Sequence, residues 1–244
     1  MGRNLITAFD FKPGRRIANK YEILKKIGSG IEGEVYQILE LRTGIERAAK
    51  FFFPHRNPAN KTSAFYAKKL HKLRQCPILI QYHTEEQILF HKAPVTVMIS
   101  EFVDGVMLED FVAAAPGRRL SPYIGLHLLY ALIRGIEQIH LMNEYHGDLH
   151  VQNIIVNRFG LGFKLKLIDF YNWSVAASAE CRKDDLVSAI GIFYECIGGR
   201  KFYAKHSKAV KDICCGLNYT RILKKFRNAT ALRKYLETVN WLDS

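Results

Sequence analysis

The stretch that most constrains this chain is His146–Asn153, which reads His-Gly-Asp-Leu-His-Val-Gln-Asn. A long segment with helical periodicity leads into it, and the apolar run Ile154–Val156 leads out. Past a predicted hairpin comes Asp169. Asp148 offers a carboxylate to orient a hydroxyl, while Asn153 and Asp169 offer the oxygen ligands that Mg²⁺ prefers. A solvated loop between two strands is the alternative, so the interpretation depends on the rest of the chain.

Length and hydropathy set the class of protein. The 244 residues are 48% hydrophobic, which suits one large domain or two small lobes. No run approaches the ~18 apolar residues of a membrane helix. The segment Met1–Lys20 is polar and basic, so we expect no secretory signal, and Ile6 stands where a myristoylation motif needs serine or threonine.

The formal net charge of +13 favours an anionic partner. Many basic residues lie in the C-terminal part: Arg200, Lys201, Lys205, Lys208, Lys211, Arg221, Lys224, Lys225, Arg227, Arg233 and Lys234. For most of them a solvated helical face is the better interpretation. No aromatic-interleaved motif accompanies them, so a nucleic-acid partner is not expected.

The cysteines point to a reducing compartment. Their number is odd, no Cys-x-x-Cys occurs, and the positions are Cys76, Cys181, Cys196, Cys214 and Cys215. We therefore expect reduced, mostly buried thiols in a cytoplasmic protein rather than a zinc site.

A β-hairpin is predicted over Tyr21–Tyr36, with the pattern G-x-G-x-x-G-x-V at its turn. Glycines allow a backbone to approach phosphates closely because no Cβ intervenes. A plain hairpin turn and a Rossmann turn are alternatives. A Rossmann turn needs a helix after the last glycine, whereas β-type residues follow here.

One lysine interrupts the next apolar strand, Arg47–Phe53. Lys50 would be costly there without a counter-charge, unless the strand lies at an edge and the amine reaches solvent. A further strand is expected over Val95–Ser100, followed by a connection at 101–105.

Three helices are predicted from periodicity and caps. Ala59–Leu73 carries no acidic residue, and Ser121-Pro122 supplies an N-cap and a first-turn proline to the strongest helix. A third helix opens in Arg182–Ala189 and ends near Gly198.

In this order the motifs resemble those of the protein kinase superfamily: G-x-G-x-x-G-x-V, A-x-K, a hinge, H-x-D-x-x-x-x-N, D-F and D-D-L. The resemblance implies an α+β, two-lobed fold, with a small antiparallel β-sheet N-lobe and a mainly helical C-lobe that lacks a full activation segment. The expected division is an extension at 1–20, an N-lobe at 21–101 and a C-lobe at 102–244.

The resemblance also implies roles in phosphoryl transfer from Mg·ATP. Lys50 would hold phosphates, Asn153 and Asp169 would hold Mg²⁺, and Asp148 would orient the attacking hydroxyl and accept its proton. Ser100 would be the gatekeeper, Ala48 would line the adenine pocket, and the backbone of Glu101 and Val103 would meet adenine. The segment Lys225–Leu236 would be the closing helix of the family. The residues implied in ATP binding are Gly28, Ser29, Gly30, Gly33, Val35, Ala48, Lys50, Glu101, Val103 and Ile155.

The chain departs from the family pattern at several positions. The helix 59–73 lacks the glutamate that pairs with the strand lysine, so Asp169, or Glu85 or Glu86, is expected to pair with Lys50. Tyr171 replaces the glycine of Asp-Phe-Gly. The resemblance also implies that Asp185 braces the backbone of the catalytic loop. His140 and His146 are expected to be packing residues rather than catalytic ones.

Three hypotheses for the function are left open, and two of them differ in the acceptor of the phosphate. A protein serine or threonine is preferred, because the glycine loop and the closing helix are protein-kinase features. A small-molecule, sugar or lipopolysaccharide kinase is the alternative, because His150 stands where protein kinases usually carry lysine. A nucleotide-binding pseudokinase scaffold is the third, supported by the missing helix glutamate and by Tyr171.

Overall fold

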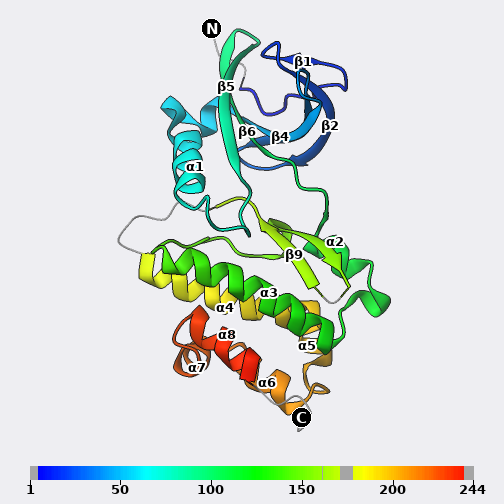
Figure 1. Cartoon of the computed structure of the whole chain (residues 1–244), viewed down its shortest axis with the longest axis vertical. Coiled ribbons are helices and arrows are strands. Elements are labelled where there is room, and N and C mark those ends of the chain that lie inside the picture. The colour runs from blue at the N-terminus through cyan, green and yellow to red at the C-terminus, as the bar shows by residue number, and fades with distance from the viewer. Residues whose placement is uncertain (1–4, 161, 171–177, 239–244) are drawn as a thin grey trace. The chain divides into compact units, whose positions relative to one another are not determined.

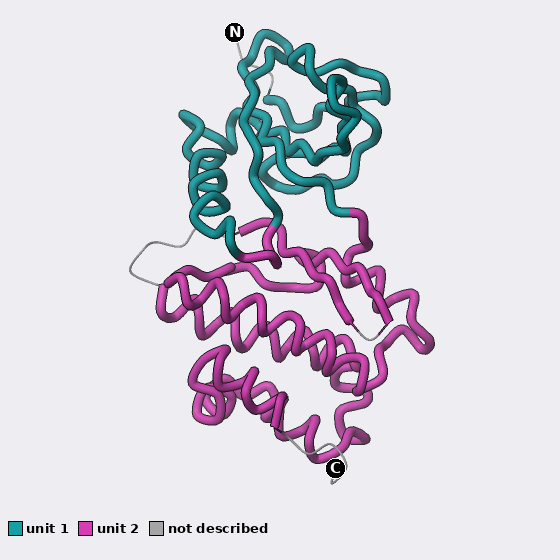
Figure 2. Tube along the Cα trace, viewed as in Figure 1, with its two compact units in different colours: residues 1–75, 80–103 teal, residues 76–79, 104–244 magenta. Residues whose placement is uncertain are grey.

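The computed structural model describes residues 5–160, 162–170 and 178–238. Tyr171, which replaces the family's glycine, lies outside the described residues. The chain divides into two compact units (Figure 2). Unit 1 comprises residues 1–75 and 80–103, and unit 2 comprises residues 76–79 and 104–244.

Unit 1 is built on an antiparallel sheet with the strand order β1-β2-β3-β4-β6-β5 (Figure 1). Its strands are β1 (Arg16–Ile17), β2 (Tyr21–Ser29), β3 (Gly33–Glu40), β4 (Ile45–Phe52), β5 (Tyr82–Phe90) and β6 (Ala93–Glu101). The hairpin and the strands expected from the sequence are therefore confirmed, and β4 is an inner strand between β3 and β6.

The N-terminal segment packs onto this sheet. Phe9 and Phe11 are buried in one aromatic cluster with Tyr36 and Phe51, and the Phe11 and Phe51 ring centroids lie 4.9 Å apart. The buried carboxylate of Glu34 accepts the backbone N–H of Phe9 at 3.2 Å. Residues of the expected basic extension thus contribute to the core of unit 1.

Helix α1 (Lys61–Lys72) lies on the other face of the sheet. It follows two short 3-10 turns, Pro54–Arg56 and Pro58–Asn60. The side chain of Thr96 on β6 donates to Asn60 at 2.8 Å, which ties the start of the helix to the sheet. The predicted helix 59–73 is confirmed with slightly shorter bounds.

Unit 2 contains a small antiparallel sheet in the order β7-β8-β9. The strands are β7 (Val106–Met107), β8 (Ile154–Phe159) and β9 (Gly162–Leu167). Residues 76–79 belong to this unit because Ile78 packs on Gly135, where any Cβ would lie 2.1 Å from the Ile78 Cδ1 atom. A parallel bridge also joins Leu79 to Leu167.

The described helices of unit 2 are α2 (Leu108–Ala113), α3 (Pro122–Leu141), α4 (Ser178–Cys196), α5 (Gly199–Tyr203), α6 (Lys208–Cys214), α7 (Tyr219–Lys225) and α8 (Ala229–Thr238). Helices α3 and α4 run side by side (Figure 1). The Ser121 side chain accepts the N–H of Ile124 at 3.3 Å, so the predicted N-cap is confirmed.

Two helix predictions need correction. Helix α4 begins at Ser178, before the predicted start. The expected closing helix 225–236 is α8, which starts at Ala229 instead, while Lys225 is the last residue of α7. The side chain of Asn228 accepts the N–H of Ala231 at 2.9 Å and so caps the start of α8.

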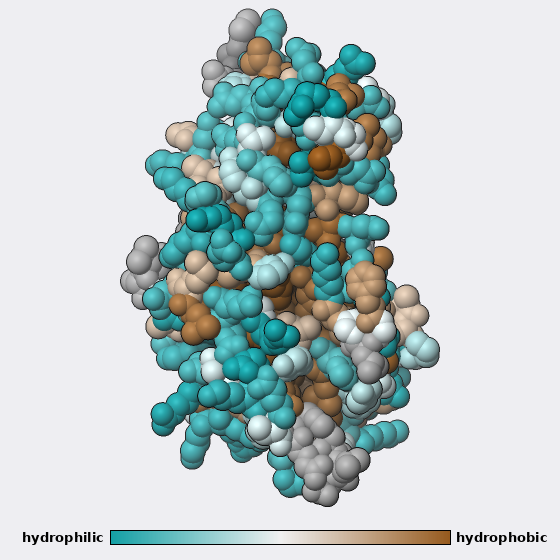
Figure 3. Space-filling model, viewed as in Figure 1, coloured by the Kyte–Doolittle hydropathy of each residue, from teal (hydrophilic) through white to brown (hydrophobic). Residues whose placement is uncertain are grey.

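All five cysteines are free thiols, and four are buried. Burial raises the pKa of the Cys196 thiol to about 12, so this side chain acts as an apolar core group. Within the described ranges, no helix has the length and hydropathy to cross a membrane. Hydrophilic side chains cover most of the face shown in Figure 3.

Candidate active site

The glycine-rich turn of unit 1 joins β2 to β3. The N–H of Gly30 donates to the carbonyl of Gly33 at 2.9 Å and closes the turn. Gly33 has a packing reason to be glycine, because a Cβ there would lie 1.9 Å from the backbone oxygen of Phe51. A Cβ on Gly30 would meet no atom of the described residues within 4 Å, so their packing does not require glycine at that position.

Lys50 lies on β4, opposite Val35 of β3 and Met98 of β6. Its ammonium forms an ion pair with the Glu32 carboxylate, with Nζ and Oε2 2.8 Å apart. Because neighbouring strand residues face opposite sides, Lys50 projects away from the face that carries the buried Phe51. The lysine therefore faces the side of the sheet on which α1 packs.

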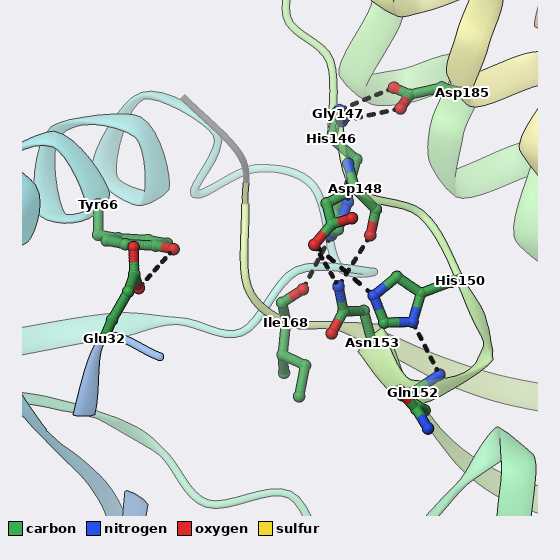
Figure 4. Close-up of polar contacts among 10 residues, drawn as sticks. All are labelled: Glu32, Tyr66, His146, Gly147, Asp148, His150, Gln152, Asn153, Ile168 and Asp185. Carbon is green, nitrogen blue, oxygen red and sulfur yellow. Dashed lines mark hydrogen bonds and ion pairs between the residues drawn. The ribbon is translucent and has the colours of Figure 1, made fainter. Parts of the chain in front are cut away.

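Helix α1 contributes Tyr66 to the same contact. The Tyr66 hydroxyl donates to the Glu32 Oε2 atom at 3.0 Å (Figure 4). The Lys50 Nζ atom also lies 4.5 Å from the centroid of the Tyr66 ring, within the range of a cation–π contact. The helix thus places an aromatic ring and a hydroxyl, rather than a carboxylate, beside the strand lysine.

The structure gives Lys50 a partner that the sequence analysis did not name. Glu86 was one of the expected acids, but its carboxylate pairs with Lys20 at 2.7 Å. Glu32 was missed because the glycine pattern was interpreted only as a backbone device. The register that sets Val35 opposite Lys50 carries the missing signal, since Glu32 lies in the turn only three residues before Val35.

The residues expected around adenine lie on and after the inner strands of unit 1. Ala48 pairs with Ser100, the expected gatekeeper, which is buried. The N–H of Glu101 donates to the carbonyl of Gln81 at 2.9 Å. The backbone role expected for Glu101 can therefore fall only on its carbonyl oxygen. Val103 follows β6 and is the last residue of unit 1.

In unit 2, the loop after α3 is held by one buried carboxylate of α4. Asp185 accepts the backbone N–H groups of His146 at 2.7 Å and of Gly147 at 2.9 Å (Figure 4). The Nε2 atom of His140 lies 3.0 Å from the same carboxylate. The predicted bracing role of Asp185 is confirmed.

His146 is a fully buried anchor of this loop. Its Nδ1 atom accepts the N–H of Asp148 at 3.3 Å, so its proton resides on Nε2, which lies 2.9 Å from the carbonyl oxygen of Ile168. The ring also packs against Phe170, with centroids 5.0 Å apart. The expectation that His140 and His146 pack rather than catalyse agrees with these contacts.

Asp148 and Asn153 meet within the loop. The Asn153 Nδ2 atom donates to the Asp148 backbone oxygen at 2.8 Å and to its carboxylate at 3.2 Å. Both partners are acceptors, so the amide orientation is fixed and Oδ1 is the oxygen left to bind a cation. Asp148 is 48% exposed at its side chain, which leaves its carboxylate accessible to an acceptor hydroxyl.

His150 caps the short 3-10 turn Val151–Asn153. Its Nδ1 atom accepts the N–H of Gln152 at 3.3 Å, so the neutral ring carries its proton on Nε2. That nitrogen lies 3.6 Å from the Asp148 carboxylate (Figure 4). The Gln152 side chain donates to Glu109 of α2 at 2.8 Å, which ties the turn to a neighbouring helix.

Asp169 follows two anchored residues. The N–H of Leu167 donates to Ile78 at 2.7 Å, and the N–H of Ile168 donates to the Asn153 carbonyl at 3.0 Å. Asp169 itself is exposed, and its φ of +52° is a left-handed conformation that few side chains adopt. One backbone hydrogen bond therefore links Asn153, an expected magnesium ligand, to Ile168, the residue directly before Asp169, the other expected ligand.

Ile155 is the remaining residue expected to bind ATP. It lies on β8 opposite Met107 of β7 and Lys166 of β9, and it is half-buried. Its Cγ2 atom would lie 2.8 Å from a Cβ on Gly105, so the glycine allows the chain to pass close to the strand.

Comparison with known proteins gives a family match. The model of the family described as protein kinase domain matches residues 21–219. Myosin-IIIa of Mus musculus is 24% identical over 180 residues, which cover 71% of this chain and 10% of that protein. Myosin light chain kinase, smooth muscle, of Gallus gallus is 28% identical over 168 residues, which cover 64% of this chain and 8% of that protein. The chain thus spans a small part of these relatives.

Proposed function

Since the chain belongs to the protein kinase domain family, we propose that it transfers the γ-phosphate of ATP to a hydroxyl group in a Mg²⁺-dependent reaction. The observation that carries this proposal is the braced loop of unit 2. Asp185 fixes the backbone of His146 and Gly147, and Asn153 fixes Asp148. A carboxylate held in this way can orient a hydroxyl and accept its proton.

The oxygen donors of unit 2 fit a magnesium ion. Asn153 offers its amide oxygen and Asp169 an exposed carboxylate, both hard ligands of the kind Mg²⁺ takes together with substrate phosphates. When bound, Mg²⁺ would neutralise charge that develops on the phosphoryl oxygens. Asn153 would hold its oxygen in place because its nitrogen is tied to Asp148.

The residues of unit 1 would bind the nucleotide. Lys50 would contact phosphate oxygens with its ammonium, and the backbone around Gly30 would approach the phosphates where no Cβ intervenes. Ala48 and the carbonyl of Glu101 would lie against the base. These roles rest on the family pattern together with the positions of the residues on the sheet.

A protein serine or threonine is the acceptor we propose first. The glycine-rich hairpin and the helices α4 and α8 are features shared with protein kinases. One relative's name, myosin light chain kinase, states a protein as its substrate. The net charge of +13 supports an acceptor or partner with acidic groups. A cytoplasmic location is proposed as well, supported by the five free thiols.

A small-molecule, sugar or lipopolysaccharide acceptor is the second candidate. The observation that favours it is His150, whose Nε2 atom lies 3.6 Å from the Asp148 carboxylate. This imidazole takes the position at which protein kinases usually have a lysine. The pseudokinase alternative loses one of its supports, because Glu32 supplies an acid to Lys50 although α1 has none.

Nucleotide binding and turnover test the proposal. Mg·ATP should raise the melting temperature, because a ligand that binds only the folded state stabilises it. Purified protein should then release ADP with generic protein acceptors, or else with sugars and lipid A-like acceptors. Asp148→Asn should abolish transfer to any acceptor. Asp110→Asn, an exposed carboxylate on α2, is the matched control and should retain turnover.

If saturating Mg·ATP does not change the melting temperature, both the hypothesis of a kinase and the hypothesis of a nucleotide-binding scaffold are contradicted. A clear shift without turnover on any acceptor, and without ATP hydrolysis, would favour the scaffold.

A further inference from the structure

We propose that Glu32 and Tyr66 are positioning residues for Lys50, so that the glycine-rich turn itself supplies the acid that α1 lacks. This inference rests on the proposed function, in which Lys50 contacts the phosphates of ATP. The Glu32 Oε2 atom accepts from the Lys50 ammonium at 2.8 Å and from the Tyr66 hydroxyl at 3.0 Å. One oxygen thus joins the turn, the strand and the helix of unit 1.

The backbone of Glu32 is fixed although it lies in a turn. Its carbonyl accepts the N–H of Phe53 at 2.8 Å, just beyond the end of β4. The next residue, Gly33, packs directly on Phe51, where a Cβ would lie 1.9 Å from the backbone oxygen. The hydrogen bond to Phe53 and the packing of Gly33 on Phe51 therefore hold Glu32 in place, and its side chain reaches Lys50, three residues before Phe53.

The electrostatics favour a persistent contact. The Lys50 side chain is only 11% exposed, while the Glu32 side chain is 34% exposed. The ammonium lies 4.5 Å from the Tyr66 ring centroid and 5.4 Å from that of Phe52. A charge among aromatic rings needs a partner to offset the loss of water. Glu32 supplies that charge at the edge of the site, where water still reaches the carboxylate.

Tyr66 contacts both the Glu32 carboxylate and the Lys50 ammonium. Its hydroxyl donates to Glu32, and its ring face lies beside the Lys50 ammonium. Tyr66 is buried and also packs against Phe52, with ring centroids 6.1 Å apart. The helix therefore fixes the lysine indirectly, through a hydroxyl that holds the acid of the turn.

Calorimetric titration with Mg·ATP and with adenosine tests this inference. Glu32→Gln removes the charge, and Tyr66→Phe removes the hydroxyl while keeping the ring. Each variant should weaken ATP binding by roughly ten- to a hundredfold, the effect of losing a hydrogen bond to a charged group. Adenosine binding should stay unchanged, because adenosine has no phosphate for Lys50 to contact. Glu22→Gln, the same change elsewhere in the sheet, should alter neither affinity.

The outcomes separate this inference from the proposed function. Wild-type protein that binds neither ATP nor adenosine would contradict the proposed function and the inference with it. Wild-type protein that binds ATP, with both variants binding it equally well, would overturn the inference alone. Tighter ATP binding by Glu32→Gln would also overturn it, since Glu32 would then compete with phosphate. An equal loss for ATP and adenosine would indicate a merely structural role.

Discussion

The carboxylate of Asp185 accepts the backbone N–H of His146 at 2.7 Å, across 39 residues of sequence. Its second oxygen accepts the N–H of Gly147 at 2.9 Å. Because Asp185 is carried by α4, which packs on α3, the loop that contains Asp148 is set by the packing of these two helices. The position of the proposed catalytic carboxylate is thus a consequence of the core of unit 2.

Asp185→Asn should lower both stability and turnover. The two N–H groups donate to different carboxylate oxygens, and the amide nitrogen that replaces one of them cannot accept, so one backbone donor loses its partner, which costs about 1–3 kcal/mol of unfolding free energy. Urea unfolding and a turnover assay would measure the two effects. Asp184→Asn is the control, because Asp184 is exposed and accepts a hydrogen bond from the Tyr219 hydroxyl at 3.1 Å. Equal stability of both variants would refute the bracing role.

Asp148→Ala and Asp169→Ala should differ in nucleotide binding. The first should keep Mg·ATP affinity and lose turnover, on the order of 10²–10³ in rate, because it removes only the group that we propose orients the hydroxyl. The second should also weaken Mg·ATP binding, because it removes a proposed magnesium ligand. Titrations with and without Mg²⁺ distinguish the two. Wild-type turnover by Asp148→Ala would show that the role assignment is wrong.

Gly33→Ala and Gly30→Ala should separate packing from phosphate binding. The added Cβ at Gly33 would collide with the backbone of Phe51, so stability should fall by about 1–3 kcal/mol. At Gly30 the Cβ meets nothing, so stability should change by no more than about 0.5 kcal/mol while ATP affinity falls. Thermal unfolding and ATP titration measure both. Unchanged ATP affinity in Gly30→Ala would argue against a phosphate-binding turn.

Glu34 should make stability depend on acidic pH. Burial alone would raise the pKa of its carboxyl, but hydrogen bonds from Lys26, Tyr36 and the N–H of Phe9 outweigh burial and hold this pKa below its usual value. Its contribution is therefore present above the unfolded-state pKa and lost as the pH falls through the folded-state pKa.

Glu34→Gln should accordingly cost about 1–3 kcal/mol near pH 7. The difference from wild type should shrink below about pH 4, where the carboxyl protonates in the unfolded chain. Urea unfolding across this range measures it, with Glu22→Gln as the control. If the stability difference between wild type and Glu34→Gln stays constant with pH, the charged form of the Glu34 carboxyl is not its cause.

Activity should not need phosphorylation of the segment between Asp169 and α4. Gly147 stands where regulated protein kinases usually carry an arginine to pair with such a phosphate. Its φ of +84° disfavours any side chain there. Protein treated with a phosphatase and then purified should keep its turnover rate. A large drop after treatment would show that a phosphate is required.

Some parts of this protein follow from the sequence alone. The order of the motifs identifies the family, because each motif needs only local residues at fixed spacing. The hairpin, the strand with Lys50 and the Ser121 cap of α3 are local in the same sense. Turn chemistry, periodicity and capping act within a few residues, so they can be predicted without tertiary contacts.

The tertiary structure decided what distant residues do for one another. The pairing of β3 with β4 brings the turn residue Glu32 to Lys50, so that the lysine has an acidic partner although α1 carries no acidic residue. The Asn228 side chain caps α8, so the closing helix starts at Ala229 rather than at the expected Lys225. Phe9 joins the core because the buried Glu34 accepts its N–H. Such contacts depend on which faces meet after folding, and a linear pattern does not encode the distances between them.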